Sequence, residues 1–308
     1  MTCHVNRSLE ELFLTLLWKV LCKLPEPWKT SELGRPPYTT KSVTAACIAK
    51  LMLDKTYEGT EAWTKANKLF RELTGYEGIP QSVIHRGMEK LSKRHIKLVC
   101  RRLTIEFRRK GIEAVIDATG LKLRTSSAWY DIRIGRKTKK KDFLKLHIIG
   151  CFRTGLIHSF TVTGGRSHDS PQLKVLLSVI QKVLKMAGDS AYLSRPNCTL
   201  VKEKGGKPFF MVKCNVTARP KSHPAWKAMV RFYWEDKKQW LREYHIRSYA
   251  EAIFAAIKKR FGNFLRSVRR DMQEKELSLK VVCYNIVRVL YLRAAKELGV
   301  PLWVKVRR

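Results

Sequence analysis

Hydrophobic positions in the first third of the chain recur at helical spacing. Apolar stripes with a period near 3.6 residues run through Leu9 to Lys23 and Lys41 to Asp54, and they continue through Glu61 to Thr74 and Pro80 to Phe107. A proline-rich connector between the first two stripes cannot form a continuous helix. We therefore predict that residues 1–110 form a helical N-terminal region.

Two segments of this region have two interpretations each. Residues 79–91 (IPQSVIHRGMEKL) follow a turn and have the pattern of the second half of a DNA-binding helix-turn-helix. A simple helical hairpin that packs on the next domain fits equally well. The connector contains Gly34-Arg35-Pro36-Pro37, which could place an arginine in a DNA minor groove or serve as a plain linker.

From residue 111 the pattern changes to that of a sheet. Ala114 to Ala118 is a short apolar run, and Phe143 to Phe152 and Leu156 to Thr163 alternate like the two strands of a hairpin. The elements predicted after the hairpin are a helix from Pro171 to about Lys182, strands at Val183 to Ala187 and Pro208 to Lys213, and a helix from Ile246 to Phe261. This order predicts an α/β fold in which a mixed sheet is flanked by helices.

The charge of the chain narrows the classes of partner. Lys and Arg total 62 against 26 Asp and Glu, which gives a formal net charge of +36. Self-repulsion on this scale favours a polyanionic partner, and nucleic acid is the first candidate. The eight cysteines are dispersed without a C-x-x-C pair, and no apolar run approaches the roughly 20 residues that a membrane span needs. We expect a cytoplasmic protein without a membrane partner.

Two aspartates interrupt or follow short apolar strands. Asp117 lies within AVIDA, and Asp189 follows the strand that ends at Gly188. A carboxylate buried in such a place needs a counter-charge, and two of them on neighbouring strands could share a hard cation. For each aspartate alone, a helix cap or a loop position is an equally simple interpretation.

A third carboxylate lies on a helix among cations. In Tyr244-x2-Arg247-x3-Glu251-x6-Lys258, the four side chains fall within about 60° of one another at about 100° per residue. A glutamate between an arginine and a lysine suits a metal ligand among phosphate-binding cations. An ordinary amphipathic helix with an i, i+4 ion pair is the alternative.

These motifs together resemble the DDE transposases of bacterial and archaeal insertion sequences. The spacing of Tyr244, Arg247, Glu251 and Lys258 is similar to the Y-R-E-K signature of that group. The segments that resemble the other family motifs, in the family's order, are VIDATGLK, KKKDFLKLHIIGCFRTGLI, SHDSPQL and AGDSAY. The similarity covers about residues 111–265, and the N-terminal helices correspond only loosely.

The resemblance implies an RNase H-like catalytic domain over residues 111–308, with an insertion at about 214–242. It implies that Asp117, Asp189 and Glu251 form the catalytic triad and bind two Mg²⁺ or Mn²⁺ ions. It also implies cleavage at the element ends and joining of the 3′-OH to target DNA. Tyr244, Arg247 and Lys258 would hold the phosphates of the transposon end near the metals, and Tyr244 could instead stack on a base. The expected partner is double-stranded DNA, namely the terminal inverted repeats and the target. A homodimer acting at the nucleoid is expected.

Other polar residues and other functions stay open at this point. His147 and His168 match family motifs without a ligand-spaced partner, and the basic run Arg136 to Lys141 is a surface loop or a DNA contact. The rival carboxylates are Asp131, Asp142 and Asp169. A nuclease or resolvase of the same fold would share the triad, and an inactive, domesticated derivative would only bind DNA.

Overall fold

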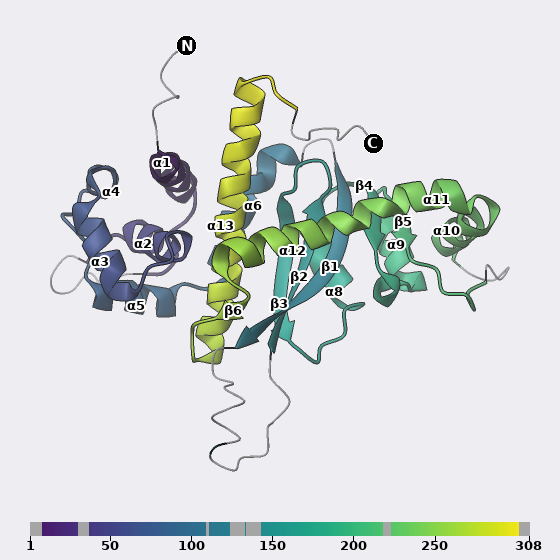
Figure 1. The fold of residues 1–308 in the computed structure, drawn as a ribbon, viewed down its shortest axis with the longest axis horizontal. Helices are drawn as coiled ribbons and strands as arrows, with labels where there is room; N and C mark the ends of the chain where they lie inside the picture. The colour runs from purple at the N-terminus through teal and green to yellow at the C-terminus, as the bar shows by residue number, and fades with distance from the viewer. Residues whose placement is uncertain are drawn as a thin grey trace. The chain divides into compact units, whose positions relative to one another are not determined.

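The structure is a computed structural model that describes residues 8–29, 37–108, 111–123, 133, 143–217 and 223–301. The chain divides into two compact units. The helical unit comprises residues 1–103 and 269–308, and the sheet unit comprises residues 104–268. Their elements are labelled in Figure 1. In the described ranges, no helix is long and apolar enough to cross a membrane.

Most of the helical unit follows the predicted stripes. Its helices are α1 (Leu9–Cys22), α2 (Thr40–Met52), α3 (Tyr57–Ala66), α4 (Lys68–Thr74), α5 (Gln81–Lys90), α6 (Lys93–Thr104) and α13 (Arg270–Glu297). Two stripes that predicted single helices are each divided in two. Asn67 Oδ1 accepts a hydrogen bond from the Phe70 amide at 2.8 Å, and Ser92 Oγ accepts one from His95 at 3.1 Å. Both side chains cap the second helix of their pair.

The predicted division at residue 110 differs from the observed one at the C-terminal end. We expected residues 111–308 to form one domain, but α13 packs with α1, α2 and α5 in the helical unit. The physical reason is the burial of its first half on several sides, including the polar residues Lys275, Glu276 and Lys280. A helix that is buried all round needs partners on every face, and the helical unit supplies them.

The sheet unit is built on a mixed sheet. Its strands are β1 (Ile112–Leu123), β2 (Phe143–Cys151), β3 (Ile157–Gly164), β4 (Val183–Gly188), β5 (Lys207–Phe210) and β6 (Phe264–Leu265). Within the described residues the order is β3-β2-β1-β4-β5, and β6 pairs with the end of β1. The β1–β2 and β2–β3 pairs are antiparallel, whereas β4, β5 and β6 run parallel to their neighbours. This confirms the predicted mixed sheet.

Helices flank this sheet, as predicted. The remaining elements are the 3-10 turns η1 (Ile105–Phe107), η2 (Ser190–Tyr192) and η3 (His245–Arg247), and the helices α8 (Gln172–Leu177), α9 (Arg195–Glu203), α10 (Pro224–Glu235), α11 (Lys237–Tyr244) and α12 (Ser248–Phe261). Figure 1 shows α12 crossing the sheet, and its Ile253 lies over Val115 and Gly150. Helix α8 packs on β2 and β3, and α9 packs on β4 and β5.

Some predicted boundaries shift for local reasons. The helix expected to reach Lys182 ends at Leu177, where Ser178 Oγ donates to the Val175 carbonyl at 2.7 Å. Arg108 donates to the Val179 carbonyl at 3.2 Å. Side chains therefore pair with carbonyl groups at the end of the helix and just after it. The described part of residues 214–242, where we expected an insertion, contains α10 and most of α11.

Close contact between β1 and β4 depends on Gly188. A Cβ atom at this position would lie 2.7 Å from Ile116 Cγ2 and 3.1 Å from Phe210 Cδ1. We expect Gly188→Ala to lower the free energy of unfolding by about 1–3 kcal/mol, because both neighbours belong to strands that cannot move apart freely. Urea unfolding measures this loss.

An Ile116→Ala background provides the control, because it removes the conflicting methyl group. There Gly188→Ala should cost clearly less. Equal costs in the two backgrounds would show that the contact with Ile116 is not the reason for the glycine.

Candidate active site

The pairing of β1 with β4 brings the two aspartates to the same edge. Ile116 pairs with Gly188, so the next residues, Asp117 and Asp189, are neighbours in a parallel register. Side chains alternate between the faces of a sheet, and both aspartates therefore project to the face opposite to Ile116. Val115 lies on that same face, beneath Ile253 of α12. The two predicted aspartates are thus together, on the side that α12 covers.

Asp117 is largely buried and surrounded by charge. Its Oδ1 accepts a hydrogen bond from the Ala118 amide at 2.8 Å, and its Oδ2 accepts one from Arg247 Nη2 at 3.3 Å. Burial raises the pKa of Asp117, and the negative charges of Asp189 and Glu251 raise it further, against the opposing effects of Ala118 and Arg247. A carboxylate in this environment gains from an added cation.

Asp189 begins the turn that follows β4. Its Oδ1 accepts a hydrogen bond from the Ala191 amide at 3.0 Å and so caps η2. The capping role that the sequence left open is therefore present. It occupies one carboxylate oxygen, and it orients the side chain beside Asp117.

Glu251 lies in the first turn of α12, with 61% of its side chain exposed. Its Oε1 accepts a hydrogen bond from Arg247 Nη1 at 3.0 Å. Arg247 therefore contacts two of the three predicted acids at once, one on β1 and one on α12. As the structure stands, and within its described residues, no group of three or more His, Cys, Asp or Glu side chains is arranged to hold one metal ion.

The signature residues do not all lie on one helix. Tyr244 ends α11, Arg247 ends the 3-10 turn η3, and Glu251 and Lys258 lie on α12, where the sequence predicted one helix from Ile246 to Phe261. The tighter turn changes the angle of Tyr244, whose ring stacks on Trp240 with the centroids 5.1 Å apart. One face of the Tyr244 ring is therefore already covered, which leaves less room to stack on a base.

Lys258 reaches the strand that carries the first aspartate. Its Nζ donates a hydrogen bond to Thr119 Oγ1 at 2.7 Å. Sequence reasoning missed Thr119, although it lies two residues after Asp117 in a strand and therefore on the same face. That period of two was the available signal. Cations from η3 and α12 thus contact alternate residues of β1.

A second polar cluster lies on the opposite face. His147 pairs with Ala118 across the β1–β2 ladder, so its side chain points away from the face of Asp117. Asp169 Oδ1 lies 2.6 Å from Lys145 Nζ and 3.6 Å from His147 Nδ1. Thr163 Oγ1 lies 2.8 Å from His147 Nε2. Asp169 therefore belongs to a structural cluster between β2 and the start of α8.

The other residues considered from the sequence have simpler positions. His168 is exposed. Asp131, Asp142, the run Arg136 to Lys141 and the arginine of the Gly34-Arg35-Pro36 segment lie outside the described residues. Tyr192 is fully buried, and its hydroxyl has no hydrogen-bond partner in the described part of the chain.

Comparison with known proteins identifies the family of this chain. A family described as "Transposase DDE domain" matches residues 108–286, which include all three acids and the four signature residues. The match covers more than half of the chain. The chain therefore belongs to the family of transposases with a DDE domain. It is a DNA transposase, a metal-dependent enzyme that cuts and joins DNA.

A curated relative is similar over most of the chain. A probable transposase of insertion sequence element ISA1214 from Archaeoglobus fulgidus is 27% identical over 275 residues, which are 85% of this chain and 79% of the relative. The solved synaptic complex of the piggyBac transposase with hairpin DNA has a TM-score of 0.47 and 10% identity. It covers 96% of this chain and 74% of that one.

Lowering the pH should reduce the stability that His147 contributes to the cluster with Lys145 and Asp169. Burial lowers the pKa of His147 to about 4, despite the nearby Asp169. The unfolded chain then binds more protons than the folded one between about pH 6.5 and 4, so stability falls as the pH is lowered through this window. We expect the advantage of the wild type over His147→Gln to shrink by about 2 kcal/mol from pH 7 to 4.5.

Urea unfolding at several pH values measures this change. The control is His168→Gln, which removes an exposed histidine from the same region and should keep the pH dependence of the wild type. Parallel pH profiles for the wild type and His147→Gln would contradict the prediction.

Proposed function

We propose that this transposase moves an insertion sequence, by cleaving at the element ends and joining the freed 3′-OH to target DNA. The name of the relative in Archaeoglobus fulgidus supports an insertion sequence as the substrate. The observation that carries the proposal is the β1–β4 register, which makes Asp117 and Asp189 neighbours on the face covered by the helix of Glu251.

We further propose that Asp117, Asp189 and Glu251 bind two Mg²⁺ or Mn²⁺ ions. Carboxylate oxygens are the ligands that these hard ions prefer, and the raised pKa of Asp117 reflects burial and acidic neighbours that a cation would relieve. When bound, two such ions activate a water or a 3′-OH and stabilise the leaving oxygen of an in-line displacement. The three side chains would hold and orient this centre.

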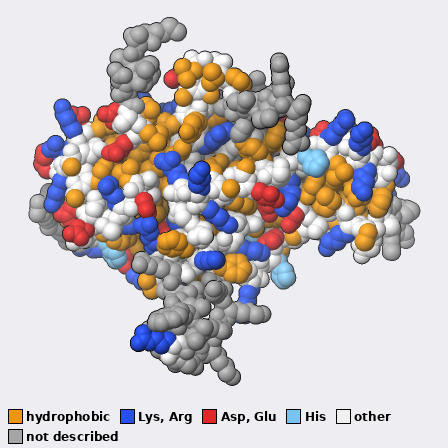
Figure 2. All heavy atoms as spheres, viewed as in Figure 1, with side chains coloured by type: hydrophobic (Ala, Val, Ile, Leu, Met, Phe, Trp, Pro, Cys, Tyr) orange, Lys and Arg blue, Asp and Glu red, His pale blue; other side chains and the backbone are white. Residues whose placement is uncertain are grey.

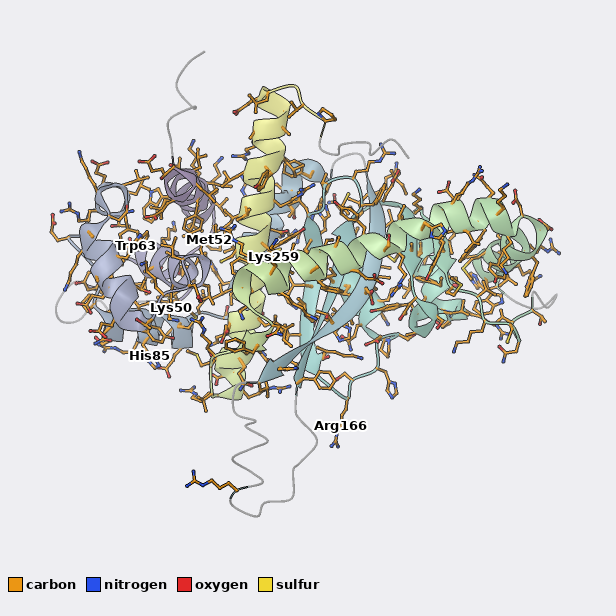
Figure 3. All side chains as sticks on the ribbon, viewed as in Figure 1. Lys50, Met52, Trp63, His85, Arg166 and Lys259 are labelled. Atoms are coloured by element: carbon orange, nitrogen blue, oxygen red, sulfur yellow. The ribbon has the colours of Figure 1, made fainter. Side chains whose placement is uncertain are left out.

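The cations beside the acids suit the phosphates of the substrate. Lys258 is held at Thr119, one alternate position along β1 from Asp117. Further cations flank the same unit: Figure 3 shows Arg166 projecting beyond the end of β3, and Lys259 is exposed on α12. We propose that Arg247 and Lys258 bind the phosphates next to the scissile bond and that Tyr244 positions Arg247 from the end of α11.

The helical unit offers a surface for duplex DNA on α5. Its buried residues are Ile84, Gly87 and Met88, and a Cβ at Gly87 would lie 2.2 Å from Val43 Cγ1 of α2. The opposite face exposes the polar residues Gln81, Ser82, His85, Arg86 and Lys90. Such a face can read base edges and phosphates in a major groove. We therefore propose α5 as the DNA-binding helix of the predicted helix-turn-helix.

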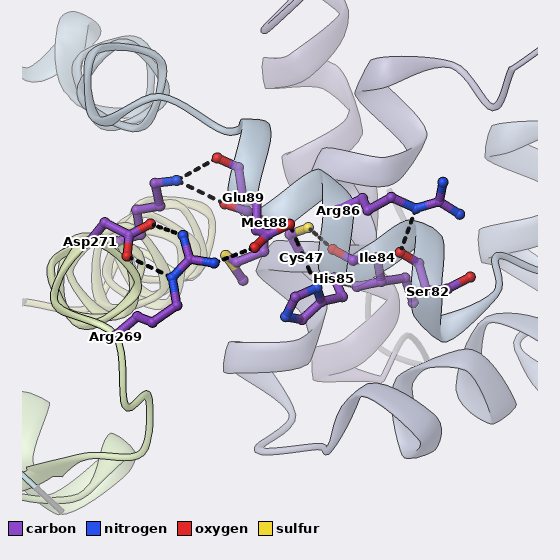
Figure 4. A network of polar contacts seen from close by, with 10 residues as sticks. Cys47, Ser82, Ile84, His85, Arg86, Met88, Glu89, Arg269 and Asp271 are labelled. Carbon is purple, nitrogen blue, oxygen red and sulfur yellow. Dashed lines mark hydrogen bonds and ion pairs between the residues drawn. The ribbon is translucent and has the colours of Figure 1, made fainter. Parts of the chain in front are cut away.

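Contacts from α13 and from Arg269, which precedes it, hold the C-terminal end of α5 in place. Lys275 Nζ donates to the carbonyls of Met88 at 3.2 Å and Glu89 at 2.6 Å, and Arg269 joins Glu89 and Asp271, as Figure 4 shows. In the same view Arg86 Nε donates a hydrogen bond to the Ser82 carbonyl of its own helix at 3.3 Å. Its guanidinium is thus well placed for a phosphate or a base.

The proposed partners follow from this arrangement. They are the terminal inverted repeats of the element and the target duplex, bound by a homodimer at the nucleoid. Figure 2 shows Lys and Arg side chains distributed over the surface drawn, which suits contact with more than one stretch of backbone.

Neutral substitutions of the acids test the metal centre. We expect Asp117→Asn, Asp189→Asn and Glu251→Gln each to reduce Mg²⁺-dependent cleavage of end DNA by at least about a thousandfold, because each removes a charged ligand. Binding of the same DNA should change little. The matched control is Asp236→Asn, which keeps the cap of α11 and should leave cleavage intact. Wild-type cleavage by any of the three variants would remove that residue from the proposal.

Substitution of Arg86 tests the surface on α5. We expect Arg86→Gln to weaken binding to end DNA by about tenfold and to reduce the salt dependence by about one counterion, if the residue contacts a phosphate. Fluorescence anisotropy at several salt concentrations measures both. The control is Lys68→Gln, which removes an exposed cation of α4. Equal affinity of Arg86→Gln and the wild type would exclude α5 as the binding helix.

A further inference from the structure

Within the described residues, Arg247 is the cation that forms ion pairs with the proposed metal ligands. Its two terminal nitrogens are divided between two carboxylates, with Nη2 at 3.3 Å from Asp117 Oδ2 and Nη1 at 3.0 Å from Glu251 Oε1. The side chain is about three-quarters buried, at 27% exposure. It joins a strand and a helix whose acids are 134 positions apart in the chain.

The contacts use oxygens that a metal ion also needs. Asp117 Oδ1 already accepts the Ala118 amide, so Oδ2 is the oxygen turned toward Arg247. A divalent ion bound between Asp117 and Asp189 would draw on the same carboxylate and repel a guanidinium at hydrogen-bond distance. The guanidinium and the ion therefore compete for Asp117.

The contacts that Arg247 makes with Asp117 and Glu251 can also be broken easily, because each is a single hydrogen bond. Arg247 makes one hydrogen bond to each acid, whereas a guanidinium holds a single carboxylate most firmly through two parallel bonds. Its Nε is buried and has no hydrogen-bond partner in the described part of the chain. A buried donor without an acceptor is unfavourable, and a phosphate oxygen could satisfy it.

We propose that Arg247 is an internal stand-in for the metal: it holds Asp117 and Glu251 toward each other before metal binding, and it leaves Asp117 when a divalent ion enters. The freed guanidinium is then available to a phosphate of the DNA end. This inference rests on the proposed metal centre. It adds an order of events, in which the metal ion binds before Arg247 engages the DNA.

The test is Mn²⁺ binding by the full chain without DNA, followed through the electron paramagnetic resonance signal of free Mn²⁺. We expect Arg247→Gln to bind Mn²⁺ more tightly than the wild type, by about threefold to tenfold, because the competing cation is gone. Arg247→Lys keeps the charge and should stay close to the wild type.

Lys258→Gln is the matched control. It removes the same charge from the same face but contacts Thr119 rather than an acid, so its effect on Mn²⁺ affinity should be clearly smaller. Thermal unfolding gives a second readout. Without metal, Arg247→Gln should melt below the wild type, and saturating Mn²⁺ should raise its melting temperature by more than it raises that of the wild type.

Each outcome decides the matter. Weaker Mn²⁺ binding by Arg247→Gln would mean that the arginine only positions the acids, and it would overturn the inference. An effect equal to that of Lys258→Gln would reduce it to general electrostatics and overturn it too. In both cases the metal centre itself would stand, provided that Asp189→Asn abolishes the binding. If the wild type showed no Mn²⁺ site that depends on Asp189, the metal centre and the inference would fail together.

Discussion

The repulsion among carboxylates that are partly withdrawn from water is the constraint on which the rest of this site depends. Asp117 and Asp189 are adjacent because of the β1–β4 register, and Glu251 faces them from α12. A folded chain tolerates such a group only with positive charge close by. Arg247 provides that charge in the structure, and divalent ions would provide it during catalysis. The stability of the metal-free chain therefore favours Arg247 at Asp117, whereas metal binding would favour its departure.

The surrounding scaffold makes this arrangement possible. Gly188 lets β4 approach β1 closely enough for neighbouring aspartates, and Ile253 anchors α12 on the same face. The short η3 turn separates Arg247 from α11 and lets it reach β1 while Glu251 stays on α12. The opposite face carries its own polar cluster around His147, which ties β2 to the start of α8 without using the acids of the site.

Local periodicity predicted the mixed sheet and the helix that carries Glu251, and the resemblance to DDE transposases singled out the three acids. Periodicity was not enough for features that depend on distant contacts. Nothing in the stripe of α13 indicates that it completes the helical unit, because a helix buried on all sides has no preferred direction. Spacing predicted that Arg247 and Glu251 would meet. It could not predict that the arginine also reaches Asp117, a contact that only the fold creates.

The most direct test of the account is a crystal structure of the full chain with Mn²⁺ and a DNA end, in which anomalous scattering locates the metal. The account predicts Mn²⁺ between Asp117 and Asp189, with Glu251 as a further ligand and Arg247 turned from Asp117 to a phosphate. Metal bound at the cluster of Lys145, His147 and Asp169 instead, or an Arg247 that still bridges both acids beside a bound ion, would contradict it.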